Sequence, residues 1–369
     1  MKILLLPNAL KGSLTARQFV RIGKRTLTNH TVKGLPISDG GDGFIDFFCA
    51  LYPNAQQISL YAKNAFLENK KTSFLYLPDQ KTAIIETARL CGLGNTPKNK
   101  LNPLGSSSYG VGQAIKKAVQ LGAKQIYVGL GGVACSDGGA GMAIACNALL
   151  KDKANNPLPL GATPLLKAHS LDLTPVKTLL KGVRIYAVSD VKNSVLGKKS
   201  SAKVFGAQKG ASPLQIKQLD RALSVWVRLL EKETGIAIAA TPGTAAAGAI
   251  AAGLYGAFGA QIHLGADLLF QKAHLEKQIQ WADLIITSEG KLDRQTFYGK
   301  APLAVLKLAQ KHQKKVLFIC GQLEKSALLK QPLPPLQIAV LSDFAPSEEH
   351  AQKHAAKYVA QILKTLNNG

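Results

Sequence analysis

The chain has 369 residues, of which 46 are Lys or Arg and 22 are Asp or Glu, so its formal net charge is +24. Because 46% of the residues are hydrophobic, the chain can bury a sizeable core, which excludes a disordered protein and favours roughly two domains. Five cysteines without a CxxC pair argue against a disulfide framework or a zinc site and favour a cytoplasmic setting.

The positive charge does not indicate a protein that reads nucleic acid. Only eight of the 46 basic residues are Arg, and the Lys residues are scattered along the chain rather than gathered in one basic run. We expect no nucleic-acid partner, and interpret the charge as a solvated Lys surface that also attracts small acidic molecules. The uncharged residues 235–262 are long enough to span a bilayer, but they are rich in Ala and Gly and include Pro242. We therefore expect no membrane partner either.

Strands and helices are expected to alternate along the chain. Apolar runs predict strands and helical periodicity predicts helices, beginning with a strand at 2–6 and a helix at 13–27 with Ser13 as its expected N-cap. Further strands are predicted at 32–37, 125–131, 183–189, 282–288, 315–321 and 337–342, and further helices at 110–122, 141–150, 212–233, from near 244, at 301–312 and at 354–366. Continuous apolar strands between helices indicate a parallel sheet that is covered on both faces.

Two stretches break this alternation. Residues 56–77 with 82–86 resemble antiparallel strands, and residues 151–180 are rich in Pro and Leu. We therefore predict an α/β fold in which a second, smaller α/β domain is inserted into the first. The expected boundaries are about 1–60, 100–150 and 275–369 for the parallel-sheet domain, and about 61–99 and 151–274 for the inserted domain.

Acidic residues gather where the predicted strands end. Five of six segments that follow a strand carry an acid beside Gly, Ser, Thr or Lys, namely SDGGDG, VACSDGG, SDVKN, SEGKLDRQT and GQLEK. Ligands of a parallel α/β sheet lie beyond the carboxyl ends of its strands, so this pattern predicts a catalytic cleft. Carboxylates that hold magnesium, glycine N–H groups that hold anions, and Lys side chains that neutralise phosphate together suit phosphoryl transfer.

The common signatures of other chemistries are absent. There is no GxxxxGK[ST], GxSxG or HExxH motif, and we expect no histidine-ligated metal site. GLGGVA at 129–134 matches a dinucleotide fingerprint only partly. That fingerprint also needs an acid about twenty residues further on, after a second strand, and this region of the chain is predicted to be helical.

The Gly-rich segment GLGGVACSDGGAG, residues 129–141, lies between a predicted strand and a predicted helix. We expect it to present backbone N–H groups to an anion at the helix start. Asp137 in this segment could bind magnesium, contact a substrate hydroxyl, or only cap the helix.

Nine blocks, in the same order along the chain, resemble the bacterial glycerate kinase family. They are PNALKGSL, SDGGDG, ETARLCGL, NPLGSSSYGVGQ, GLGGVACSDGGAGMA, SDVKNSVLG, VFGAQKGA, PGTAAAGAIAAGL and ADLIITSEGKLDRQTFYGKAP. The resemblance implies a flavodoxin-like domain with a second α/β domain inserted. It further implies a cytoplasmic kinase that transfers the γ-phosphate of ATP to a hydroxyl of glycerate, with Mg²⁺ as cofactor and 2-phosphoglycerate favoured over 3-phosphoglycerate. Stereospecificity and oligomeric state stay open, with a homodimer as one option.

The same resemblance assigns roles to residues of this chain. Asp190, Asp293 and Lys209 are the expected catalytic residues, with Asp190 nearest the substrate hydroxyl and Asp293 with Glu289 nearer the magnesium ion, although these two roles could be exchanged. The expected substrate or nucleotide contacts are Lys11, Gly12, Ser13, Asp39, Gly40, Gly41, Asp42, Ser106, Ser107, Gly131, Gly132, Asp137, Gly138, Asn193, Glu289, Gln295 and Lys300.

The chain also departs from the family pattern. Asn8 stands where the family has Asp, and it cannot ionise. Val133, Cys135 and Ser136 replace polar members of the Gly-rich segment. Two alternatives therefore stay open: a kinase of the same fold that acts on another small hydroxy acid, and a catalytically silent member that binds a metabolite.

Overall fold

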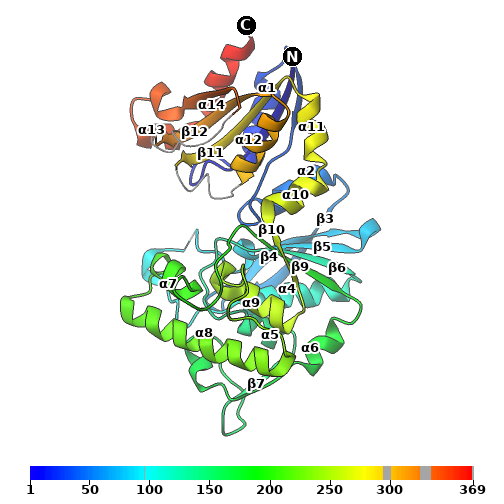
Figure 1. Cartoon of the computed structure of the whole chain (residues 1–369), viewed down its shortest axis with the longest axis vertical. Coiled ribbons are helices and arrows are strands. Elements are labelled where there is room, and N and C mark those ends of the chain that lie inside the picture. The colour runs from blue at the N-terminus through cyan, green and yellow to red at the C-terminus, as the bar shows by residue number, and fades with distance from the viewer. Residues whose placement is uncertain (95, 294–300, 325–333, 368–369) are drawn as a thin grey trace. The chain divides into compact units, whose positions relative to one another are not determined.

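Figure 1 shows the computed structural model, which describes residues 1–94, 96–293, 301–324 and 334–367. Contacts divide the chain into two units. Unit 1 comprises Met1–Asp39, Asp46–Pro53 and Gly265–Gly369, and unit 2 comprises Gly40–Ile45 and Asn54–Leu264.

This division differs from the expected boundaries at 40–45, 54–60 and 265–274, and more widely in two respects. Residues 100–150 lie in unit 2, because the strand within them pairs with strands of that unit. The inserted unit is also the larger of the two, since its main segment alone covers more than half of the chain.

Unit 1 is built on a five-stranded sheet in the order β13-β12-β11-β1-β2. The strands are β1 (Lys2–Pro7), β2 (Thr31–Gly34), β11 (Leu284–Leu292), β12 (Lys315–Leu323) and β13 (Leu336–Val340), and all neighbours are parallel. Numbered within the unit, this is the flavodoxin-like order 2-1-3-4-5, with its switch point between β1 and β11. The flavodoxin-like expectation is thus confirmed for unit 1.

Helices cover both faces of this sheet (Figure 1). The helices of unit 1 are α1 (Ala16–Thr26), α10 (Gly265–Lys272), α11 (Leu275–Trp281), α12 (Ala301–Lys311), α13 (Glu348–Lys353) and α14 (Ala355–Lys364), with most of α2 (Phe44–Leu51). Ile3, Leu5 and Ile286 join Phe19 of α1 and Val359 of α14 in one apolar core. The start of α1 differs from expectation, because Thr15 rather than Ser13 is the N-cap and forms a capping box with Gln18.

Unit 2 contains a six-stranded sheet in the order β10-β9-β6-β5-β4-β3. Its strands are β3 (Gln56–Lys63), β4 (Asn69–Leu77), β5 (Thr82–Glu86), β6 (Gln125–Gly129), β9 (Arg184–Ser189) and β10 (Gln261–Leu264). The four strands from β5 to β10 are parallel, whereas β3 and β4 are antiparallel, as their sequence predicted.

The helices of unit 2 are α3 (Thr87–Cys91), α4 (Tyr109–Gln120), α5 (Ala140–Ala145), α6 (Thr174–Leu179), α7 (Ser201–Phe205), α8 (Pro213–Thr234) and α9 (Ala246–Ala257). The helix predicted over 141–150 is shorter than expected, because residues after Cys146 enter β7 (Leu149–Lys151). This strand pairs with β8 (Ser170–Asp172), in a separate antiparallel sheet. It therefore does not supply the parallel strand that a dinucleotide fingerprint needs.

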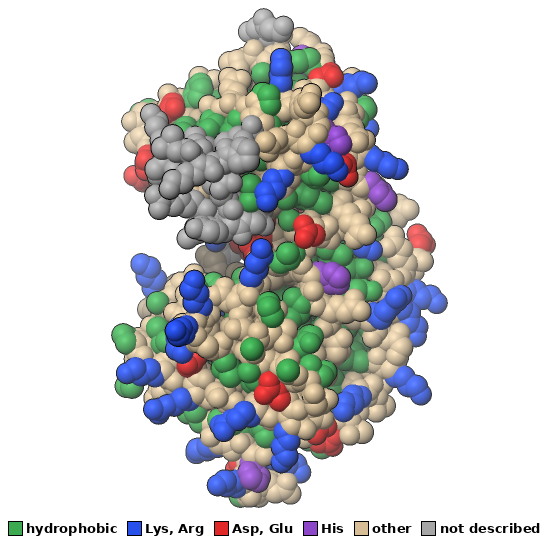
Figure 2. Space-filling model, viewed as in Figure 1, with side chains coloured by type: hydrophobic (Ala, Val, Ile, Leu, Met, Phe, Trp, Pro, Cys, Tyr) green, Lys and Arg blue, Asp and Glu red, His purple; other side chains and the backbone are tan. Residues whose placement is uncertain are grey.

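The uncharged stretch at 235–262 folds around α9, which has 12 residues. Within the residues that the structure describes, we find no helix with the length and apolar character needed to cross a bilayer. On the face shown in Figure 2, Lys and Arg side chains are spread over the surface rather than gathered into one patch. This distribution agrees with the interpretation of the charge as a solvated Lys surface.

Candidate active site

In unit 1, the loop that follows β1 lies against the end of β11. The Asn8 N–H donates to the carbonyl oxygen of Ser288 (3.1 Å), and the Ser288 hydroxyl donates to the carbonyl oxygen of Asn8 (2.8 Å). A Cβ atom on Gly290 would lie 3.1 Å from the backbone nitrogen of Lys11. These contacts bring Lys11 to the switch point of the sheet, where a flavodoxin-like fold binds its ligand.

The next two residues of this loop are anchored on α13. The Ser13 hydroxyl donates to the carbonyl oxygen of Gln352. Gly12 has a left-handed backbone (φ +76°), and a Cβ atom there would lie 3.0 Å from Nε2 of Gln352. Gly12 and Ser13 thus fix the path of the loop that carries Lys11.

Glu289 and Asp293 occupy the carboxyl-terminal end of β11. Glu289 is buried. Its charge contributes to the high pKa of the neighbouring Cys320 thiol, which burial, then the charge of Asp343 and then that of Glu289 raise to about 12. Asp293 lies 4.0 Å from the Lys291 ammonium, at the limit of an ion pair. Among the described residues, no group of three or more His, Cys, Asp or Glu side chains could hold a metal ion. Two carboxylates fit Mg²⁺ only where substrate phosphates and water complete the coordination.

Asp39 has a capping contact in unit 1, because its Oδ1 accepts the N–H of Ala301 (2.5 Å) at the start of α12. Carboxylates are favourable at this end of a helix. Gln295 and Lys300, which the sequence also assigned to the site, lie outside the described residues.

In unit 2, the Gly-rich turn at 40–45 packs on the carboxyl ends of the parallel strands. Gly40 has φ +93°, and a Cβ atom on it would lie 2.6 Å from the carbonyl oxygen of Val188, so that only glycine fits. A Cβ atom on Gly131 would lie 2.7 Å from the Cα of Gly41. One on Gly132 would lie 3.0 Å from Oδ1 of Asp42. The structure therefore brings together Gly40, Gly41, Asp42, Gly131 and Gly132, which were predicted from two distant blocks.

Glu86 holds the same turn and was not among the predicted site residues. It is the last residue of β5, it is buried, and its Oε2 accepts the N–H of Ile45 (2.9 Å). Arg89, one turn later, places its Nε 3.8 Å from Oε1 of Glu86. An acid at the end of a predicted strand was the signal used elsewhere in the chain, and it could have identified Glu86 as well.

The start of α5 does not present its N–H groups to an anion, contrary to expectation. The carboxylate of Asp137, which has no exposed surface, accepts from the N–H groups of Gly139 (3.2 Å) and Gly141 (3.1 Å). It also accepts from the N–H (2.8 Å) and hydroxyl (3.0 Å) of Ser108. With these donors already paired inside the loop, the geometry favours the capping role for Asp137.

Three more predicted residues support this loop from within. The Ser107 hydroxyl donates to Asp137 Oδ2 (3.1 Å), and the Ser106 hydroxyl donates to the carbonyl oxygen of Ala134 (3.3 Å). The Gly138 N–H donates to the carbonyl oxygen of Gly248 (3.2 Å), and the Gly138 carbonyl oxygen accepts from the indole of Trp226 (2.9 Å). Both serines are completely buried, so they stabilise the loop rather than face solvent.

Lys209 is buried beneath the Gly-rich loop. Its Nζ donates to the carbonyl oxygen of Cys135 (2.6 Å) and to the Ser136 hydroxyl (3.3 Å). Burial lowers the pKa of Lys209, although the neighbouring Cys135, Cys91 and Asp137 act in the opposite direction. The Lys209 side chain therefore connects the segment between α7 and α8 to the Gly-rich loop by hydrogen bonds. It is not one of the surface lysines.

Asp190 follows β9 and is half-buried. Asn193, which was predicted to contact the substrate or nucleotide, donates its amide to the carbonyl oxygen of Lys199 (3.0 Å) and shapes the loop. Asp190 and Asp293 were expected to follow strands of one parallel sheet. That expectation is wrong, because β9 belongs to the six-stranded sheet and β11 to the five-stranded sheet.

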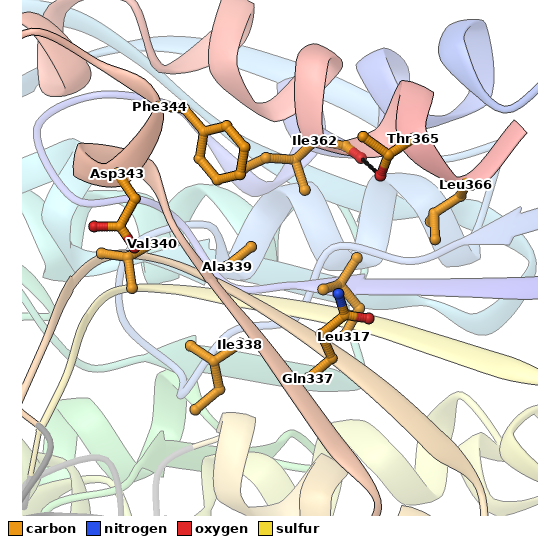
Figure 3. Close-up of a pocket in the computed structure, with 10 residues that line it drawn as sticks. All are labelled: Leu317, Gln337, Ile338, Ala339, Val340, Asp343, Phe344, Ile362, Thr365 and Leu366. Atoms are coloured by element: carbon orange, nitrogen blue, oxygen red, sulfur yellow. Dashed lines mark hydrogen bonds between the residues drawn. The ribbon is translucent and has the colours of Figure 1, made fainter. Parts of the chain in front are cut away.

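A cavity in unit 1 lies apart from the predicted residues. Figure 3 shows it beside β13 and α14, with Leu317, Ile338 and Ile362 among its apolar lining and the Thr365 hydroxyl donating to the carbonyl oxygen of Ile362 (2.7 Å). None of the residues that the sequence assigned to the site lines it. We therefore base the candidate site on the strand ends rather than on this cavity.

Comparison with known proteins decides the family. The model of the glycerate kinase family matches residues 3–368. The chain belongs to this family. It is 35% identical to a glycerate kinase of Haemophilus influenzae over 98% of this chain and 99% of that protein. It is also 34% identical to a glycerate 2-kinase of Escherichia coli, over 88% and 86% of the two chains.

Structural comparison agrees. A putative glycerate kinase 2 from Salmonella typhimurium superposes with a TM-score of 0.83 at 30% identity, covering 100% of this chain and 97% of that chain. The chain is therefore an enzyme of the kinase class, with the α/β architecture of its family.

Proposed function

We propose that this glycerate kinase family member transfers the γ-phosphate of ATP to the 2-hydroxyl of glycerate. The observation that carries the proposal is the switch point of the five-stranded sheet, where the loop bearing Lys11 meets the end of β11 bearing Glu289. A cation and a carboxylate at this position suit a nucleotide phosphate and its metal ion.

Unit 1 is assigned the phosphate chemistry. Lys11 would neutralise phosphate charge, and Glu289 and Asp293 would hold Mg²⁺, which supplies charge neutralisation and orientation of the phosphates when it is bound. Gly12 and Ser13 hold the Lys11 loop against Gln352, so its backbone needs little reorganisation when the phosphate arrives.

In unit 2, Asp190 is assigned as the group nearest the acceptor hydroxyl. Asp190 at the end of β9 would accept the proton of that hydroxyl, as carboxylates do in phosphoryl transfer. The turn at 40–45, held by Glu86, and the Gly-rich loop, held by Asp137 and Lys209, would shape the surroundings of Asp190. Loops fixed by buried hydrogen bonds position reacting groups more accurately than mobile ones.

The 2-hydroxyl is favoured over the 3-hydroxyl because one relative bears the name glycerate 2-kinase at 34% identity. The alternatives are a different small hydroxy acid as acceptor, or binding without transfer. The specific observation behind them is Asn8, which follows β1 at the switch point. Its Oδ1 accepts the N–H of Ala9 (2.9 Å), and its side chain offers no ionised group.

A coupled assay of ADP release tests the proposal with glycerate and a panel of small hydroxy acids, each with ATP and Mg²⁺. Turnover on glycerate, with the NMR signal of the proton at C2 of the product split by phosphorus, is the expected result. Phosphorus splitting of the protons at C3 would overturn the regiochemistry alone. Turnover confined to another acid, or ligand binding without ADP release, would replace the proposal with one of its alternatives.

A further inference from the structure

His350 and His354 form a pair of imidazoles at the junction of α13 and α14. The His354 N–H donates to the carbonyl oxygen of His350 (3.0 Å), so the two residues lie on successive turns of helical backbone. Their ring centroids are 4.3 Å apart, with 36° between the ring planes. The sequence HAQKH has the HxxxH spacing, which our expectation of no histidine-ligated metal site did not take into account.

Tyr358 fixes one of the two rings. Its hydroxyl lies 3.0 Å from Nδ1 of His350, and the side chain is buried, with 3% of its surface exposed. When Nδ1–H donates to this hydroxyl, the lone pair of the His350 ring is at Nε2. A hydrogen bond of this kind from a fixed partner is how proteins orient a histidine for metal binding.

We propose that His350 and His354 together bind one transition-metal ion of the kind that prefers imidazole, such as Zn²⁺. Metal–nitrogen bonds to histidine are about 2.0–2.1 Å long, and two histidines four residues apart with a helical backbone bond between them can turn one nitrogen each toward the same ion. No larger cluster of His, Cys, Asp or Glu that could hold a metal occurs in the described part of the chain. Water or another small ligand would therefore fill the remaining positions, which makes this an open site.

The charges nearby also bear on the site. Partial desolvation, followed by the charges of His350, Lys353 and Lys357, lowers the pKa of His354. The same two lysines repel a divalent cation. The proposal therefore predicts that removing the charge of Lys357 strengthens metal binding.

The metal site would also act on the candidate active site of unit 1. Gln352 lies between the two histidines, its carbonyl oxygen accepts the Ser13 hydroxyl, and its side chain approaches Gly12. An ion that links His350 to His354 would hold this turn, and through it the loop that carries Lys11. This effect is separate from the Mg²⁺ of the proposed function, because Mg²⁺ prefers oxygen ligands.

Isothermal titration of the untagged full-length protein with Zn²⁺ tests the site. We expect binding that excess Mg²⁺ does not displace. His350→Gln and His354→Gln should each weaken it by at least about tenfold, and Tyr358→Phe by about tenfold, because loss of an orienting partner typically costs 10- to 100-fold in affinity. Lys357→Gln should strengthen binding, whereas His169→Gln, an exposed histidine in unit 2, should leave it unchanged.

Amide hydrogen exchange provides a second measurement on the wild-type protein, which avoids any question of folding in the variants. Added Zn²⁺ should slow exchange over residues 350–358 and at Ser13. Absence of Zn²⁺ binding, wild-type affinity in both histidine variants, or protection that leaves residues 350–358 unchanged would overturn the site. Protection of 350–358 without any change at Ser13 would overturn its link to the Lys11 loop.

Discussion

The ammonium of Lys209 donates a hydrogen bond of 2.6 Å to the carbonyl oxygen of Cys135, at a position where only 3% of the Lys surface is exposed. A buried cation that faces a neutral carbonyl has lost its hydration without gaining an ion pair there. Gly248 makes room for it, since a Cβ atom on that residue would lie 2.7 Å from Nζ. We infer that the fold retains Lys209 because it holds the Gly-rich loop, whether or not it also reaches a phosphate.

Lys209→Met should therefore reduce turnover by about 10²-fold, since it removes charge-assisted hydrogen bonds that hold the loop. Lys203→Met is the matched control, because Lys203 lies on the surface, where its ammonium pairs with Asp220 (2.9 Å) and donates to the carbonyl oxygen of Gly197 (3.0 Å). Steady-state kinetics on both purified variants check this. Unchanged kinetics in a folded Lys209→Met protein would show that the loop does not need the cation.

The stability of the protein should also depend on Lys209 in the alkaline range. Burial lowers the pKa of this Lys below its ordinary value of 10.5, so the unfolded chain binds a proton that the folded chain has already released. Stability then rises with pH between the folded pKa and 10.5, and the contribution is constant above that value. Denaturant unfolding of the wild type from pH 8 to 10.5 should show this rise. In Lys209→Met the rise should be smaller, and identical curves for the two proteins would contradict the burial argument.

Asp137→Asn should destabilise the protein more than it affects chemistry. The Asn amide would turn a donor toward N–H and hydroxyl groups that now donate to the carboxylate, leaving buried donors unpaired. We expect a loss of about 3 kcal/mol in the free energy of unfolding, the upper range for a hydrogen bond to a charged group. Denaturant unfolding against the exposed control Asp79→Asn measures it. Normal stability with abolished turnover would instead make Asp137 a catalytic group.

Asn8→Asp tests whether the departure from the family pattern has weakened the enzyme. An Asp side chain keeps the oxygen that accepts the Ala9 N–H and adds a charge at the switch point. We expect turnover or magnesium affinity to rise, while the exposed control Asn147→Asp changes neither. A fall in activity would mean that the site has adapted to a neutral residue at position 8. No change would place that residue outside the chemistry.

Sequence reasoning succeeded where one local pattern determines the outcome. The apolar runs at 2–6 and 282–288 are parallel strands, because each is buried on both faces, and the acids of the second run, Glu289 and Asp293, lie at its carboxyl end. Glycine-rich turns were also recognisable as sites of close approach, as Gly40 and Gly131 show.

Pairing between distant strands could not be deduced in this way. The sequence of residues 125–129 is equally compatible with a strand of either sheet. Their pairing with β5 and β9 is what places them in the six-stranded sheet. This is why Asp190 and Asp293 were assigned to one sheet although they end strands of two. Likewise, a glycine-rich helix start predicts exposed N–H groups, but the sequence does not reveal that the Asp137 carboxylate and the Ser108 side chain already accept them.

Phosphorylation of glycerate should depend on the acids at the strand ends. The most direct test measures ADP release with glycerate for the wild type, Asp190→Asn and Asp293→Asn, each checked for folding and assayed across a magnesium titration. We predict turnover by the wild type and a loss of about 10²- to 10⁴-fold in both variants. Asp293→Asn should also shift the magnesium requirement. An inert wild type, or near-normal turnover in both variants at every magnesium concentration, would contradict the account.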